Sequence, residues 1–227
     1  MDKKIKYLIL LSLICFFSVS INAQKETDLG GSLTFEVNKD LSRFFTLSFD
    51  EEIRFVNNNK YNFDRSATTI GMDYSLIRRK LKVGAYYTFL YLYNSDYLFE
   101  ARHRYFFNIM YKEDVGSFTL SWRGRFQGTI RDENRGEYNV NPKYVLRNRF
   151  QAEYNFWKSR WTPYLSCDLA TVLNDPRYDL TRIRLQSGTE VRLTRTAYAG
   201  AFLRYDFNYE KGENNRLTVG LSYRIKM

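Results

Sequence analysis

Apolar and polar residues alternate with a period of two along most of the chain. In GSFTLSWRGRFQGTI (116–130) the large apolar residues fall on even positions, from Phe118 through Trp122 to Ile130. Polar residues fill the odd positions, which include Arg123 and Arg125. Successive side chains of a β-strand point to opposite faces, so this period predicts a strand with one apolar and one polar face.

The same alternation recurs in the segments 44–55, 81–93, 100–111, 145–156, 181–193, 199–209 and 216–225. With the less regular stretches between them, they predict ten strands from Leu41 to Met227, and SLTFEV (32–37) is an eleventh candidate. Many of these segments exceed the about 5–6 residues that are common in globular sheets. The chain has 19 Tyr, 18 Phe and only 3 Pro among 227 residues, a composition that favours long, uninterrupted strands.

The connections between the predicted strands alternate in length. Every second connection is short, and these lie at 38–40, 77–80, 112–116, 157–160 and 194–196. The connections between them are longer at 56–65, 131–143 and 172–179, but short at 94–96 and 210–214. This arrangement is typical of outer-membrane barrels. We therefore predict an all-β fold, a single antiparallel up-and-down transmembrane β-barrel of 10–12 strands. Even strand numbers are usual, so either 25–40 lies at the rim or inside a ten-stranded barrel, or a twelfth strand lies in Lys25–Gly31 or a long loop.

In such a barrel the apolar face meets lipid and the polar face lines the lumen. The residues expected to face lipid are Phe107, Trp122, Phe126, Leu185 and Leu203. The charged residues expected to face the lumen are Glu52, Arg54, Glu100, Arg102, Arg104, Arg123, Arg125, Arg147, Arg149, Glu153, Arg182, Arg184, Glu190 and Arg204. The alternative is a secreted, soluble β-barrel or sandwich with its aromatic face inward, which predicts shorter strands.

The amino terminus predicts export. A basic start, MDKKIK, is followed by the apolar run YLILLSLICFFSVS and by INAQ, so we expect a signal peptide at 1–23 with cleavage after Ala23, and a barrel domain at 24–227. The rival interpretation, a lipoprotein signal at Cys15, lacks small residues before the cysteine. Three lysines and one aspartate leave with the segment, so the net charge falls from +10 to +8.

Few residues offer chemistry. After cleavage Cys167 is the only cysteine and His103 the only histidine, so no zinc site is expected, and we predict no metal and no cofactor. An exported chain without a Lys/Arg-rich arm also argues against nucleic acid as a partner. Trp157 and Trp161 at one end, and Tyr91, Tyr93, Tyr97, Tyr178 and Tyr209 near the other, suit interfacial aromatic girdles.

The sequence resembles a bacterial family of domains of unknown function, number 2490, whose members are regarded as outer-membrane β-barrels. The resemblance lies in LSRFFTLSFDEEIRF (41–55), FEARHRYFFNIMY (99–111) and RWTPYLSCDL (160–169). It implies a barrel in the outer membrane of a bacterial cell. It implies no activity and no catalytic residue.

Three functions follow from these features. The first is a non-enzymatic structural or binding role, with outer-membrane lipid as the surroundings and the lumen filled by paired charges. Glu52, Glu100, Glu153 and Glu190 are the expected partners of the arginines. The second is a small porin-like channel that prefers anionic solutes. The third is a lipid-modifying enzyme that uses His103, but positions 101 and 105 are Ala and Tyr, which leaves the histidine without a serine two residues away.

Overall fold

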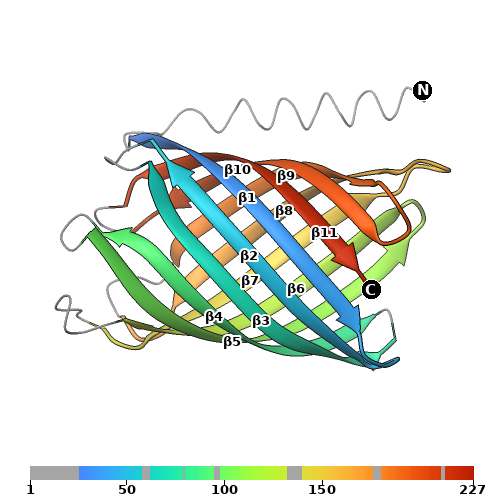
Figure 1. Cartoon of the computed structure of the whole chain (residues 1–227), viewed down its shortest axis with the longest axis horizontal. Coiled ribbons are helices and arrows are strands. Elements are labelled where there is room, and N and C mark those ends of the chain that lie inside the picture. The colour runs from blue at the N-terminus through green and yellow to red at the C-terminus, as the bar shows by residue number, and fades with distance from the viewer. Residues whose placement is uncertain are drawn as a thin grey trace.

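The chain forms a closed barrel of eleven strands in a computed structural model (Figure 1). The structure describes residues 26–57, 62–78, 80–94, 98–131, 140–175, 180–210 and 213–227, so the predicted signal peptide at 1–23, Tyr97 and Tyr178 lie outside the described residues. The strands are β1 Thr27–Asp40, β2 Phe45–Val56, β3 Phe63–Ile77, β4 Leu81–Asn94, β5 Leu98–Val115, β6 Phe118–Arg131, β7 Lys143–Tyr154, β8 Trp161–Val172, β9 Leu180–Arg192, β10 Ala197–Asn208 and β11 Asn215–Lys226.

The barrel closes by a parallel pair, which corrects the prediction of a wholly antiparallel barrel. Each strand pairs antiparallel with the next one along the chain, but β1 pairs parallel with β11, from Thr27↔Asn215 to Asn38↔Lys226. In a meander with an odd number of strands the first and last strands run in the same direction, so their pairing must be parallel. The expectation of an even number was wrong: the candidate strand at 32–37 is the centre of β1, and the described residues form no twelfth strand.

The strands are long enough to cross the apolar part of a bilayer. They contain 12 to 18 residues. At about 3.3 Å per residue and a tilt of about 40°, twelve residues span roughly 30 Å, compared with an apolar band of about 25 Å in outer-membrane barrels. Figure 1 shows the strands inclined to the long axis of the barrel, as closure requires. Among the described residues no helix has the length and apolar character needed to cross a membrane.

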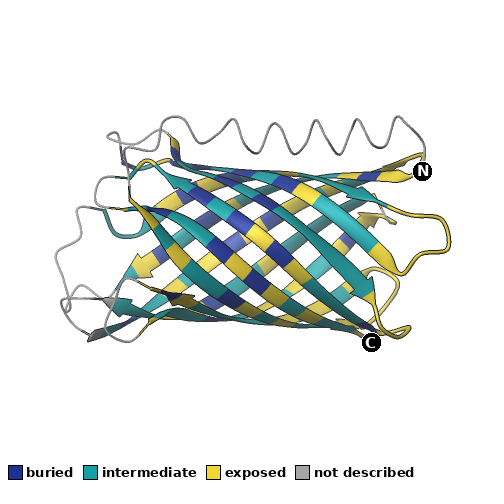
Figure 2. Cartoon of the chain, turned by 90° about the horizontal axis from the view of Figure 1, so that it is seen from above, coloured by how far each residue is buried: buried dark blue, intermediate teal, exposed yellow. Residues whose placement is uncertain are grey.

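The two faces of the wall differ in the way that the alternation predicts. Figure 2 shows buried and exposed residues alternating along the strands. Large apolar side chains are exposed on the outer face, with Phe107 at 61 %. The buried side chains of the inner face are mostly polar or charged, and they include Glu100, Asp168, Arg184 and Asp206. The apolar surface therefore faces outward, the reverse of a soluble barrel with an aromatic core.

The two ends of the barrel differ in the length of their connections. One end, here called the turn end, carries the connections 41–44, 78–80, 116–117, 155–160 and 193–196, and the C-terminus also lies there. The other, the loop end, carries 57–62, 95–97, 132–142, 173–179 and 209–214. The alternation in length is confirmed, but two turns fall later than expected because β1 extends to Asp40 and β5 to Val115. Gly116, with φ of 61°, makes the tight turn after β5 without a side-chain clash.

Glycines of the inner face make room for aromatic rings inside the barrel. A Cβ atom at Gly71 would lie 1.9 Å from the ring of Tyr86, and one at Gly220 would lie 2.1 Å from the ring of Phe202. These rings therefore lie flat against the neighbouring strand. In this way an aromatic side chain covers the backbone that a strand glycine leaves bare.

Candidate functional site

The lumen is the candidate site, because the inner face carries most of the charged side chains of the strands. All fourteen charged residues expected there lie on this face, opposite the exposed apolar residues. Four pairs of arginines stand directly opposite one another on adjacent strands: Arg54↔Arg65, Arg102↔Arg131, Arg123↔Arg149 and Arg125↔Arg147. Like charges in such positions repel one another, so acidic partners have to reach them from elsewhere.

Asp168 on β8 is the main acidic partner. Its carboxylate accepts two hydrogen bonds from Nη2 of Arg147, at 2.8 and 2.9 Å, and a third from Nε of the same residue at 3.1 Å. Arg149 donates to it at 3.2 Å, and Arg123 lies 3.9 Å away. Asp168 is only 1 % exposed. One buried carboxylate therefore joins the arginines of β6 and β7. Hydrogen bonds between ionised groups are stronger than those between neutral groups, and removing the carboxylate would leave buried charges unpaired.

A second group of ion pairs lies on the strands around the seam where the barrel closes, and one of these pairs crosses it. Asp206 accepts from Arg184 at 2.5 and 3.0 Å. Glu52 accepts from Arg54 at 2.7 Å, from Arg204 at 3.4 Å and from the hydroxyl of Ser32 at 3.1 Å. The contact between Glu52 and Arg204 crosses β1 and β11 to join β2 to β10, so ionic contacts reinforce the parallel closure.

Two further acidic residues at the loop end hold arginines. Glu100, which is fully buried, accepts from Arg102 at 2.7 and 2.8 Å. Asp64 of β3 pairs with Arg65 and, past β2 and β1, with Arg216 of β11, each at 2.9 Å.

The expected pairing of four glutamates with the central arginines is therefore correct only in part. Glu52 and Glu100 do pair with arginines of the predicted set. Glu153 instead pairs with Lys112 at 3.5 Å, and Glu190 pairs with Arg224. Asp168 and Asp206, which make the most buried pairs, were not predicted as partners. Their inward parity was visible in the sequence, but the register that places Asp168 opposite Arg149 and Arg184 was not.

Three central arginines lack a carboxylate partner among the described residues. Arg104 donates to the hydroxyl of Thr129 at 3.2 Å, and Arg125 donates to Asn108 at 2.8 Å. Nε of Arg182 is buried and has no hydrogen-bond partner in the described part of the chain. The guanidinium of Arg104 is repelled by Arg65, Arg147 and Arg182. The lumen therefore combines a paired ionic network with a local excess of positive charge.

An aromatic shelf occupies the lumen beside this network. Tyr86 and Phe106 stack with their centroids 4.8 Å apart, and Arg125 lies 3.8 Å above the ring of Phe106. The hydroxyl of Tyr86 donates to Asp73 at 2.6 Å. Neither aromatic residue was predicted to face the lumen. These side chains fill space and hold Arg125 in a fixed position by a cation–π contact.

The outer face carries the residues expected to meet lipid. Phe107, Phe126 and Leu203 are exposed, and Trp122 and Leu185 lie on the same face but are half-buried by their neighbours. Trp157, at 88 % exposure, and Trp161 stand at the turn end. Cys167 is half-exposed and unpaired with another cysteine.

Glu51 and His103 are polar residues on the mostly apolar outer face. Glu51 of β2 accepts hydrogen bonds at 2.5 Å from the hydroxyls of Ser66 and Thr68 on β3. Nδ1 of His103 lies 2.6 Å from the hydroxyl of Tyr87, and its ring contacts those of Tyr87 and Phe89. The hydrogen bonds of Glu51 were not predicted, although its parity, shared with Phe49 and Ile53, places it on the apolar face.

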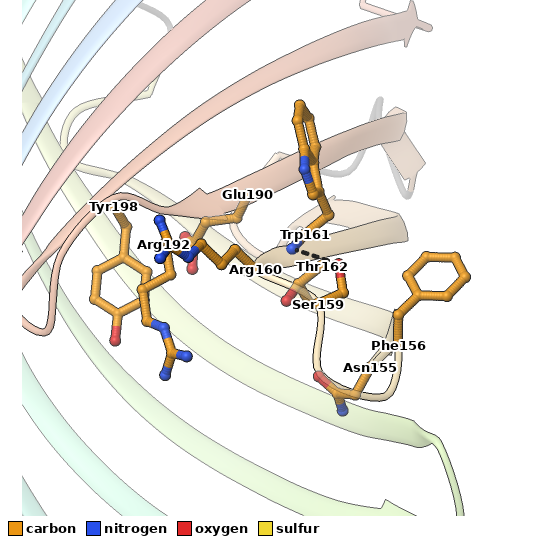
Figure 3. A pocket seen from close by; sticks show the side chains of 9 residues that line it. All are labelled: Asn155, Phe156, Ser159, Arg160, Trp161, Thr162, Glu190, Arg192 and Tyr198. Carbon is orange, nitrogen blue, oxygen red and sulfur yellow. Dashed lines mark hydrogen bonds between the residues drawn. The ribbon is translucent and has the colours of Figure 1, made fainter.

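A pocket of about 230 Å³ opens at the turn end, beside β8, β9 and β10. Figure 3 shows Glu190, Arg192, Arg160 and Tyr198 gathered together, whereas the side chains of Trp161 and Phe156, which also line the pocket, extend away from these four. Ser159 accepts a hydrogen bond from the backbone of Trp161 at 3.1 Å, and the backbone of Arg192 donates to that of Arg160 at 2.9 Å. These contacts tie the 155–160 turn to β9. No group of His, Cys, Asp and Glu able to hold a metal occurs in the described ranges.

Comparison with known proteins gives one family. No curated protein sequence matches the chain. The family described as "Protein of unknown function (DUF2490)" matches residues 32–217, which include every strand from β2 to β10. The resemblance seen in the sequence is thereby confirmed: the chain belongs to the DUF2490 family.

Proposed function

We propose that the protein is an integral outer-membrane β-barrel with a non-enzymatic structural or binding role, whose lumen is occupied by an ionic network. One observation carries the proposal: exposed apolar side chains cover the outside of a closed wall, while the inside holds buried ion pairs. A closed wall pairs the backbone groups that lipid cannot satisfy. The predicted export segment at 1–23 fits the same location.

The ion pairs favour a lumen that conducts poorly. Asp168, Asp206 and Glu52 each bind arginines from a neighbouring or more distant strand, so the charged side chains of the inner face are bound to one another. Buried charges that are paired and hydrogen-bonded are stable and leave few free groups to pass an ion. Two measurements test the proposal. The protein should fractionate with outer membranes, and purified protein in a planar bilayer should show little steady conductance.

A small anion-preferring channel is a second candidate, favoured by a specific observation. Arg104 and Arg182 have no carboxylate partner in the described residues, and uncompensated arginines are the groups that line anion pores. A steady, anion-selective conductance that falls in Arg104→Gln/Arg182→Gln would favour this function over a closed lumen. The contacts of His103 with Tyr87 and Phe89 offer no hydroxyl of a serine, so no observation favours a lipid-modifying enzyme.

A further inference from the structure

The pocket at the turn end has a positive lining. Of its lining residues, Arg160, Arg192 and Glu190 carry charge. Glu190 is already engaged by Arg224 of β11, which also lies 3.5 Å from Glu36. Neither Arg160 nor Arg192 has a carboxylate partner in the described part of the chain. The two guanidinium groups therefore leave a charge of about +2 to be balanced by whatever enters the pocket.

Tyr198 supplies a fixed, neutral wall to the same pocket. Nζ of Lys226 lies 4.7 Å from the centre of its ring, and the guanidinium of Arg224 lies 5.8 Å from it. These cations hold the ring in place and add to the positive potential around it. The side chains of Tyr198 and Arg192 extend alongside each other (Figure 3), so a hydroxyl and a guanidinium face the same space. Both can donate hydrogen bonds to an oxyanion.

We propose that this pocket binds a phosphate monoester on a small organic body. A phosphate monoester carries about −1.5 to −2 charges at neutral pH and three acceptor oxygens, which matches two free guanidinium groups and a phenol. The arginine fork suits such an oxyanion geometrically. A volume of about 230 Å³ also leaves room for an organic body beside the phosphate group. The function goes beyond that of the barrel wall, because it assigns a ligand to its turn-end mouth.

Two sources supply this chemistry. One is a soluble phosphate monoester that enters from the aqueous side of the turn end. The other is a lipid headgroup, since the pocket is also lined by the exposed aromatic residues Trp161 and Phe156, which an apolar tail could contact. Glycerol 3-phosphate is the probe for the first source. Phosphatidic acid in a phosphatidylcholine nanodisc is the probe for the second, because both probes carry the same phosphate monoester.

The test compares two double variants that remove the same charge. Arg160→Gln/Arg192→Gln removes the guanidinium groups of the pocket. Lys158→Gln/Arg195→Gln removes two exposed cations that do not line the pocket. Lys158 lies in the 155–160 turn and Arg195 in the 193–196 turn, close in sequence to Arg160 and Arg192. Binding is measured for the full-length folded barrel at about 0.15 M salt, where long-range attraction by the basic rim is screened. Glycerol 3-phosphate is titrated by calorimetry with glycerol as the neutral control, and bound phosphatidic acid is counted by native mass spectrometry.

We expect one saturable site, weakened at least tenfold in Arg160→Gln/Arg192→Gln and less than twofold in Lys158→Gln/Arg195→Gln. Tyr198→Phe, which keeps the ring, should weaken it severalfold. Binding of glycerol 3-phosphate identifies a soluble ligand, and binding of phosphatidic acid alone identifies a headgroup. Equal losses in the two double variants would show attraction by the rim as a whole and overturn the proposal. Absence of saturable binding to both probes in the parent protein would overturn it as well.

Discussion

Glu51 and Glu52 are neighbours in the sequence and stand on opposite faces of the wall. Glu52 points into the lumen, where Arg54, Arg204 and Ser32 bind it. Glu51 points outward between apolar residues, where the hydroxyls of Ser66 and Thr68 are its partners among the described residues. Each carboxylate is hydrogen-bonded, but only the inner one is neutralised. In a membrane, as proposed, the wall would separate a region in which paired charge is stabilising from one in which charge is costly.

The inner region should be most sensitive at Asp168, where one carboxylate holds arginines of two strands. Asp168→Asn removes the charge that Arg147, Arg149 and Arg123 share, and leaving buried charges unpaired costs about 3–5 kcal/mol. Urea unfolding of the barrel in lipid vesicles, followed by tryptophan fluorescence, measures the loss.

Asp50→Asn is the matched control. Asp50 also lies on the inner face, but the described residues give it no ion pair. It should lose far less stability than Asp168→Asn. Equal losses would mean that the ion pairs of Asp168 contribute no more to the free energy of unfolding than an unpaired inner carboxylate does.

On the outer face, the loss of stability caused by an added charge should depend on the depth of the substituted residue. Phe107→Arg places a cation near the middle of β5 on the outer face, and about 2–4 kcal/mol of stability should be lost if this face meets lipid. Val115→Arg, on the same face at the turn end of β5, should lose at most about 1 kcal/mol. The same unfolding assay compares them. If both variants fold into bilayers as well as the parent, the outer face does not lie in lipid.

Packing inside and outside the wall should differ in the same way. Gly220→Ala brings a Cβ to 2.1 Å from the ring of Phe202 on the inner face, so the ring must move and about 1–3 kcal/mol should be lost. Gly31→Ala, whose nearest contacts are ordinary ones at 3.7 Å to the outward ring of Phe55, should be nearly neutral. Thermal unfolding by circular dichroism measures both. A neutral Gly220→Ala would mean that the interior around Phe202 is loosely packed.

The comparison also shows what the sequence alone could predict. Period-two alternation was sufficient for the strands, the two faces and the inward side chains, because the direction of a strand side chain depends only on parity. The alternation could not predict that β1 is a full-length strand that pairs parallel with β11. The number of strands, and with it the direction of the closing pair, depends on where the first strand starts. Pairing across strands depends on register, so the role of Asp168 was missed. Glu51 shares its parity with Phe49 and Ile53, so its outward direction was visible, but the register that brings the hydroxyls of β3 beside it was not.

The smallest effect should come from Glu51, and its sign is the informative part. Glu51→Leu removes a carboxylate from the apolar outer face, at the cost of two hydrogen bonds from Ser66 and Thr68. Outward acidic residues destabilise barrels less than the about 2–4 kcal/mol of Arg or Lys at mid-membrane, so the variant should gain about 1 kcal/mol or less. Glu52→Leu should lose stability, since it removes the carboxylate that pairs with Arg54 and Arg204. If Glu51→Leu loses stability too, the hydrogen bonds from Ser66 and Thr68 outweigh the cost of the outward charge, and the two faces do not differ in the way proposed.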